Sequence, residues 1–184
     1  MQPVKERIKE VAFQLFKDNG YDNVTVNKIC LECKIPKQVF YKCLLTKDEL
    51  IIEFFNDIKI AINKEIKEGK FVGSPITKLS EMFASYITHI TYCGSEIISE
   101  LFTINLYKNY KSFVLEDVFS NFCIDTIKSG QADGSFKNLG SPKNLFYSIY
   151  NMFLGYVLRW SILAQMEDIK ENMKISLKEI LIVK

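Results

Sequence analysis

The sequence is poor in the residues that most catalytic sites require. It has a single histidine, His89, and shows no nucleophile motif, no glycine-rich phosphate loop and no carboxylate pair at a plausible spacing. The cysteines are odd in number and irregularly spaced, which argues against a disulfide framework: Cys30, Cys33, Cys43, Cys93 and Cys123. We therefore expect neither an enzyme nor a disulfide-rich secreted domain, and no cofactor.

Long hydrophobic runs are also absent. The N-terminal residues MQPVKERIKEVAF alternate charged and apolar side chains, unlike a signal peptide. The most apolar run, 145–158, contains Asn151 and Gly155 and is shorter than the roughly 20 residues that a membrane span needs. No segment alternates with the period of a strand, and no repeat is visible. These absences predict a soluble, cytoplasmic, all-α protein without a membrane partner.

The composition, with 48% hydrophobic and 25% charged residues, is typical of a globular protein. The charged residues are unevenly distributed along the chain. Residues 1–48 hold nine Lys/Arg and six Asp/Glu, whereas the remainder holds fifteen and sixteen. Between positions 28 and 47 five lysines face one acidic residue, Glu32. A basic cluster at one end of a near-neutral chain favours a polyanionic partner there.

Residues 1–48 have the pattern of a three-helix helix-turn-helix domain. An apolar stripe from Val4 to Phe16 ends at Gly20, Thr25 can cap a short second helix, and a third runs from about Pro36 to Leu44. In that third helix Val39, Phe40 and Leu44 can face inward. This leaves four side chains for a DNA groove: Lys37, Gln38, Tyr41 and Lys42.

Residues 49–184 predict a larger helical domain for ligand binding and dimerisation. A capping box at Thr46 and Glu49 opens a long helix that fades near Gly69. Further helices are expected at about 74–90, 95–106, 110–129, 141–165 and 167–181, with a turn-rich loop at 130–136.

Aromatic and Met side chains are abundant in this second domain. Such side chains ordinarily form a core, but in a helical domain they can also enclose an apolar cavity with a few polar groups. The candidate lining is Met82, Tyr86, His89, Phe119, Phe122, Tyr147 and Asn151. His89 is open to two interpretations, a packed hydrogen-bonded histidine or a polar contact to a ligand.

The spacing of Cys30 and Cys33, with Cys43 near, admits half a zinc site or a redox pair. A zinc site needs four ligands, and the chain has one such pair and one histidine, so no metal is expected. Cysteines three apart on a helix are more often small core residues.

Four runs of the N-terminal domain resemble the DNA-binding domain of the TetR family in order, spacing and helix breaks: IKEVAFQLFKDNGY (8–21), VTVNKIC (24–30), IPKQVFY (35–41) and TKDEL (46–50). The rest of the chain resembles that family only in architecture, including Gly130, Gly134 and Phe136 of the expected loop.

The resemblance implies a homodimeric, ligand-responsive repressor of a double-stranded DNA operator. Thr25, Tyr41 and Lys47 fall on positions that usually touch phosphate, with Lys37 beside them, and Lys28 of the basic cluster is a further candidate for DNA contact. The departures from the family pattern include Lys34 for Gly, Pro36 for a capping Ser, Val39 for a Thr that often meets DNA, and Lys42 for a common His. The operator sequence therefore cannot be inferred from the operators of related proteins.

The helix at about 144–165 is apolar almost all round, as expected when one side packs on its own domain and the other on a partner. With the last helix it predicts a four-helix dimer interface that includes Trp160, Leu163, Leu177 and Leu181. In the dimer, the third helix of each subunit would enter the major groove. An apolar or aromatic effector would favour a different distance between these two helices and so release the DNA, and the helix from Thr46 would act as the lever that transmits the change. The alternative is a helical small-molecule-binding protein whose helix-turn-helix is degenerate and no longer binds DNA. The departures at Pro36 and Val39 suggest this alternative.

Overall fold

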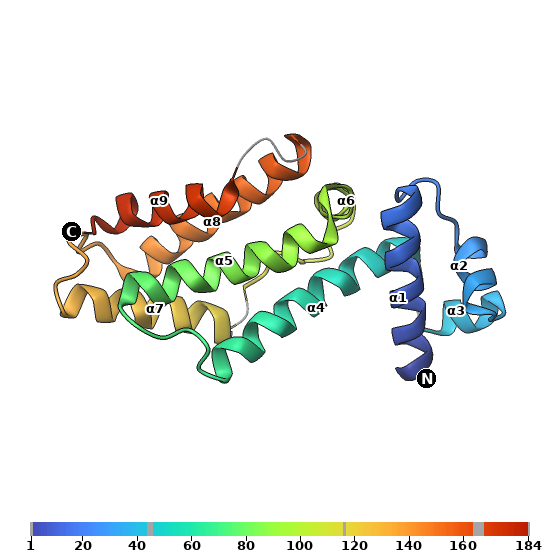
Figure 1. The fold of residues 1–184 in the computed structure, drawn as a ribbon, viewed down its shortest axis with the longest axis horizontal. Coiled ribbons are helices and arrows are strands. Elements are labelled where there is room, and N and C mark those ends of the chain that lie inside the picture. The colour runs from blue at the N-terminus through green and yellow to red at the C-terminus, as the bar shows by residue number, and fades with distance from the viewer. Residues whose placement is uncertain (1, 44–45, 116, 164–167, 184) are drawn as a thin grey trace. The chain divides into compact units, whose positions relative to one another are not determined.

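The computed structural model describes residues 2–43, 46–115, 117–163 and 168–183, and the fold over these residues is all-α (Figure 1). Its helices are α1 (Gln2–Asn19), α2 (Val26–Cys33), α3 (Lys37–Cys43), α4 (Lys47–Lys67), α5 (Pro75–Cys93), α6 (Ser95–Tyr107), α7 (Asp117–Ala132), α8 (Pro142–Leu163) and α9 (Ile169–Leu181). Within the described residues the one β pairing is an isolated bridge between Phe136 and Val183. The predicted fold class is confirmed.

The chain divides into two compact units. Unit 1 comprises residues 1–57 and 93–112, and unit 2 comprises residues 58–92 and 113–184. Helices α1 to α3, the first part of α4 and α6 thus belong to unit 1, while α7, α8, α9 and most of α5 belong to unit 2.

The core of unit 1 follows from the apolar stripe of α1. Ile8, Ala12 and Phe16 are fully buried or nearly so, together with Phe40 of α3. The Phe16 ring packs against Tyr21 at a centroid distance of 5.1 Å, and Gly20 ends α1 with φ +77° while its N–H donates to the Phe16 carbonyl at 2.9 Å. The helix boundaries expected for residues 1–43 agree with this arrangement.

The core of unit 2 is a cluster of aromatic rings from three helices. Neighbouring rings lie 5.0–6.2 Å apart between centroids, in tilted and edge-to-face arrangements: Phe83, Tyr86, Phe119, Phe146, Tyr150 and Phe153. Such pairs stabilise a core beyond the burial of their area. The abundance of aromatic residues is therefore explained in large part by packing.

Two boundaries in unit 2 differ from expectation. The helix expected from about 110 begins at Asp117, because Lys111 takes φ +56° and the Asn109 side chain accepts its N–H, which turns the chain before a helix can start. At the other end, α7 continues through Gly130, expected in a loop, to Ala132. The Phe136 ring packs on Gly130, where an added Cβ would lie 2.3 Å from it. Expected helix ends at Leu44, Gln165 and Glu167 lie outside the described residues.

Candidate DNA-binding face and effector cavity

The connection between α2 and α3 is set by hydrogen bonds at both helix ends. Thr25 Oγ1 accepts the Lys28 N–H at 3.2 Å at the start of α2, as the sequence predicts. At the end of α2, Lys34 adopts the left-handed conformation, and the Val39 N–H donates to the Pro36 carbonyl at 2.9 Å as α3 begins. A helix-turn-helix is therefore formed with Pro36 in the place of a capping side chain.

Helix α3 has one buried and one exposed face. Phe40 is fully buried and Val39 half-buried, as expected, whereas Leu44 lies outside the described residues. The four side chains expected to face a groove are exposed: Lys37, Gln38, Tyr41 and Lys42. The Tyr41 ring stands edge-on to Phe40 at 5.5 Å and remains 48% exposed. This face presents two cations, an amide and a phenol to solvent.

The three remaining candidates for DNA contact make bonds within unit 1. Thr25 is exposed but caps α2, and Lys28 Nζ donates to Asn19 Oδ1 at 2.8 Å. Lys47 Nζ donates to the carbonyls of Tyr21 and Val24 at 2.9 and 3.1 Å. The Lys47 ammonium also lies 3.7 Å from the centroid of the Tyr21 ring.

Asp48 connects this region to the end of α6. Its carboxylate accepts the Tyr21 hydroxyl and the Lys108 ammonium, each at 2.7 Å. Burial alone would raise the pKa of Asp48, but the hydrogen bonds from Lys108 and Tyr21 outweigh burial and hold the pKa below its ordinary value. Burial, with Asp48 beside it, raises the pKa of Tyr21, so this hydroxyl acts as a donor. Burial lowers the pKa of Lys47, against the opposing effect of nearby Asp22, Asp48 and Glu100.

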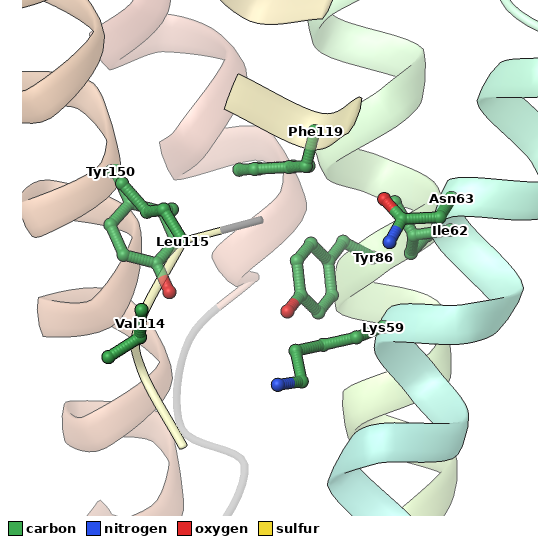
Figure 2. A pocket seen from close by; sticks show the side chains of 8 residues that line it. All are labelled: Lys59, Ile62, Asn63, Tyr86, Val114, Leu115, Phe119 and Tyr150. Atoms are coloured by element: carbon green, nitrogen blue, oxygen red, sulfur yellow. The ribbon is translucent and has the colours of Figure 1, made fainter. Parts of the chain in front are cut away.

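Unit 2 contains a small cavity against its aromatic cluster (Figure 2). It is lined by Lys59, Ile62, Asn63, Tyr86, Val114, Leu115, Phe119 and Tyr150. The cavity measures about 20 Å³, whereas a dry cavity that admits benzene measures roughly 150 Å³. In this state the site has room for about one water molecule and no effector.

Only Tyr86 and Phe119 of the expected ligand residues line this cavity. Met82 is fully buried elsewhere in the core, and Phe122 packs against Phe71 at 5.9 Å. Tyr147 and Asn151 are exposed on α8. The other five candidates thus lie outside this cavity, and their contact with an effector stays a prediction.

His89 also lies outside the lining, at the surface between α4 and α5. Its side chain is 36% exposed, and Nε2 lies 3.4 Å from Glu65 Oε1, which also accepts Lys70 at 2.7 Å. Glu65 Oε2 accepts the Ser85 hydroxyl at 2.6 Å. Burial would raise the pKa of Glu65, but these partners outweigh it and keep the pKa low. The histidine helps to hold two helices together, which agrees with the hydrogen-bonded interpretation.

Sequence reasoning missed the α4 side of the cavity. Lys59, Ile62 and Asn63 lie on the helix from Thr46 that is expected to act as a lever, and the spacing within α4 points these side chains to the cavity. Figure 2 shows the Lys59 ammonium and the Tyr86 hydroxyl directed to the same space. Across it, the Tyr150 hydroxyl donates to the Phe113 carbonyl at 3.5 Å, and burial raises the pKa of Tyr150. The polar groups are thus few and lie among apolar ones.

A second, wider depression lies between α5 and α9. It encloses about 440 Å³ and is open to solvent, with Ile76, Thr77, Ser80, Glu81, Ala84, Lys174 and Lys178 around it. Its lining combines the charged side chains of Glu81, Lys174 and Lys178 with apolar and hydroxyl groups.

The expected dimer residues are distributed over two faces. Leu177 and Leu181 are fully buried in unit 2 and Trp160 nearly so, because α9 packs its apolar side on α8 (Figure 1). These three are core residues, which corrects their assignment to an interface. Leu163 is 41% exposed.

Four of the five cysteines are buried, and Cys43 is half-buried. Burial raises the pKa of Cys93 to about 11 and also raises the pKa of Cys30, Cys33 and Cys123, which disfavours the reactive thiolate form of these side chains. In the part of the chain that the structure describes, no group of three His, Cys, Asp or Glu side chains could hold a metal ion. No helix among the same residues is long and apolar enough to cross a membrane.

Comparison with known proteins finds a family match in the N-terminal residues and a more distant relative over nearly the whole chain. Residues 8–54 match the sequence profile of the tetR family of bacterial regulatory proteins. The HTH-type transcriptional repressor DhaR of Mycobacterium sp. (strain GP1) is 22% identical over 192 residues, which cover 97% of this chain and 93% of DhaR.

Two solved structures share the fold. FadR of Thermus thermophilus, a TetR family transcriptional repressor in complex with lauroyl-CoA, superposes with a TM-score of 0.71 at 16% identity, covering 96% of this chain and 93% of FadR. AibR, in complex with isovaleryl coenzyme A and operator DNA, superposes with a TM-score of 0.59 at 16% identity, covering 98% of this chain and 100% of AibR. Residues 8–54 thus carry the sequence pattern of the tetR family of bacterial regulatory proteins, and the chain as a whole shares the all-α fold of these two solved structures.

Proposed function

We propose that the chain is a ligand-responsive transcriptional repressor that works in the cytoplasm and binds a palindromic operator as a homodimer, with residues 1–48 as the DNA-binding domain and 49–184 as the ligand-binding and dimerisation domain. The observation that carries this proposal is the exposed face of α3. Lysines there suit phosphate or guanine, Gln38 suits adenine, and the Tyr41 hydroxyl suits phosphate. An intact helix with this face favours DNA binding over a degenerate helix-turn-helix.

The DNA proposal is tested by titrating the protein onto the DNA upstream of its own gene over a series of salt concentrations. Lys42→Ala should weaken binding, whereas Lys67→Ala, which removes an exposed charge at the end of α4, serves as the matched control. Gln38→Ala should change the preference among operator sequences rather than scale affinity uniformly. A wild-type protein that shows no salt-dependent binding would favour the small-molecule-binding alternative.

We assign the dimer contact to the outward face of α8. Tyr147, Leu154, Leu158 and Ile162 recur there at helical spacing, and Ile162 is 66% exposed. Gly155 lies on the same face with open space above its Cα, so a partner helix could approach closely. An exposed apolar stripe of this length is typical of a protein interface.

The interface is tested by analytical ultracentrifugation. Ile162→Glu should convert the dimer into a monomer that keeps its helical content and loses tight operator binding, because the two readers are then no longer linked. Leu177→Glu is a contrasting variant that should unfold unit 2 instead, since that side chain is buried. A wild-type monomer at micromolar concentration would overturn the assignment.

We infer that the effector is apolar or aromatic, or carries an acyl chain, and that it enters beside the aromatic cluster. The complexes of FadR and AibR with acyl-CoA molecules are the reason for including acyl thioesters. Because the cavity is so small here, the effector must select a more open state and draw the population toward it. Lys59, Asn63 and the two tyrosine hydroxyls could orient its polar end.

Effector binding is tested by thermal shift with acyl-CoAs of graded chain length and with planar aromatic compounds. A ligand at a hundred times its Kd should stabilise the fold by about 2.7 kcal/mol. Hits are then added to the protein–operator complex, where release of DNA is expected. Hits that stabilise the protein without releasing DNA would show binding to both states alike, and would contradict the regulatory role.

A further inference from the structure

Lys34 occupies the position of unit 1 where the backbone least favours a lysine. It has φ 54° and ψ 44°, in the left-handed region. Its N–H bonds to the Leu31 carbonyl at 3.0 Å, and the Ile35 N–H bonds to the Cys30 carbonyl at 3.0 Å. This pair of bonds is the Schellman ending of a helix, whose left-handed residue is usually glycine because a Cβ is strained there.

The Lys34 side chain makes no polar contact with the described residues that would offset this backbone strain. It is exposed, and within the described part of the chain it makes no hydrogen bond and no ion pair. Lys28 and Lys47, by contrast, both donate to partners in unit 1. A strained residue with a free cationic side chain indicates a use outside the folded chain itself.

The place of Lys34 suggests that use. It stands in the turn between α2 and α3, three residues before Lys37 on the exposed face of α3. When the second helix of a helix-turn-helix enters the major groove, the first crosses the sugar–phosphate backbone, so the turn lies beside phosphates. A long cationic side chain at the turn can then reach a phosphate oxygen.

We propose that Lys34 is a further phosphate contact of this protein, retained in a backbone position that glycine would fill with less strain. The inference rests on the proposed DNA-binding function. It predicts that stability and DNA binding respond to the same substitution with opposite sign, which a merely structural lysine would not produce.

Three variants separate charge from strain. Lys34→Gly relieves the strain and removes the charge, Lys34→Gln keeps the strain and removes the charge, and Lys34→Arg keeps both. Lys111→Gly is the matched control, because Lys111 also has positive φ (56°) and an exposed side chain, but lies in the connection between α6 and α7.

Binding is measured by fluorescence anisotropy on a labelled duplex of mixed sequence, several helical turns long, because phosphate contacts do not depend on the operator. For Lys34→Gly we expect a higher Tm, a folding equilibrium constant raised roughly fivefold, and weaker DNA binding. The slope of log K against log salt should fall by about 0.9 per subunit, because one phosphate fewer is neutralised. Lys34→Gln should match Lys34→Gly in binding and the wild type in stability, while Lys34→Arg should bind as the wild type does.

Lys111→Gly should raise stability and leave the salt slope unchanged. If Lys34→Gly and Lys34→Gln bind this duplex with the wild-type affinity and salt slope, Lys34 is not a phosphate contact, and the inference fails while the proposed function stands. If the wild type does not bind duplex DNA at any salt concentration, both fail together.

Discussion

Gly130 and Gly155 both lie inside helices of unit 2, yet alanine should act at the two positions with opposite sign. A Cβ on Gly130 would stand 2.3 Å from the Phe136 ring, which is fully buried. The Phe136 N–H also donates to the Gly130 carbonyl at 2.8 Å, so ring and helix are fixed to each other. A Cβ on Gly155 would meet nothing within 4 Å.

The magnitudes follow from these surroundings. Alanine is more favourable than glycine in a helix interior by about 1 kcal/mol, and at Gly155 this is the whole effect in a single subunit. At Gly130 the same gain is opposed by overpacking, which costs about 1–3 kcal/mol. The ring cannot withdraw freely, because loss of a buried Phe side chain costs about 3–5 kcal/mol. We therefore expect Gly130→Ala to lower the free energy of unfolding by up to about 2 kcal/mol.

Trp160, the one tryptophan of the chain, is buried in unit 2 and reports its unfolding by fluorescence. Urea titrations at low protein concentration should place Gly130→Ala below the wild type and Gly155→Ala above it. The double variant Gly130→Ala/Phe136→Ala should cost less than the sum of its parts, because removing the ring removes the clash. A Gly130→Ala protein as stable as Gly155→Ala would refute the reasoning from the Cβ surroundings.

Three further expectations concern the two candidate sites. Lys47→Met leaves the Val24 carbonyl without the ammonium donor and the Tyr21 carbonyl with the Val24 N–H alone, so unit 1 should lose about 1–3 kcal/mol in urea unfolding; unchanged stability would mean that water replaces the ammonium. Because the folded pKa of Asp48 is depressed, its stabilisation is present above about pH 4 and is lost as the pH falls through the folded value. Asp48→Asn should therefore flatten the acid branch of a Tm-against-pH curve, and an unchanged curve would count against the ion pair with Lys108. Phe119→Ala should open the cavity of about 20 Å³ enough for indole to raise the Tm, whereas Phe122→Ala, beside Phe71, should not.

The helices of residues 1–43 could be predicted from the sequence almost to their ends. The signals for these helices are local in the sequence. Thr25 caps α2, Gly20 ends α1, and Phe40 is the apolar residue that buries one face of the short helix α3. Lys34 in the left-handed conformation was not predictable, since glycine is the residue that marks such a position.

The candidate cavity was less predictable because its lining comes from segments far apart in the chain. Periodicity shows that Met82 and Tyr86 share a face, but not which neighbour leaves a gap beside Tyr86. Residues 110–115 were expected in a helix, so Val114 and Leu115 were not considered. Leu177 lies on the apolar face of α9. Such a face can pack on the core of its own subunit or on a partner subunit, and the sequence alone does not distinguish the two.

The bonds of Lys47 also bear on the conformational entropy of DNA binding. Its ammonium already donates to two carbonyls, so its rotamer is selected in the free protein and its third N–H has a defined direction. Lys37 and Lys42 are exposed, and holding either against a phosphate would cost up to about 2 kcal/mol of side-chain entropy. A phosphate bound by Lys47 would therefore contact a cation whose side chain is already ordered in the free protein. On the proposed function, the entropic cost of complex formation would therefore arise at α3, while Lys47 would set the register at little cost.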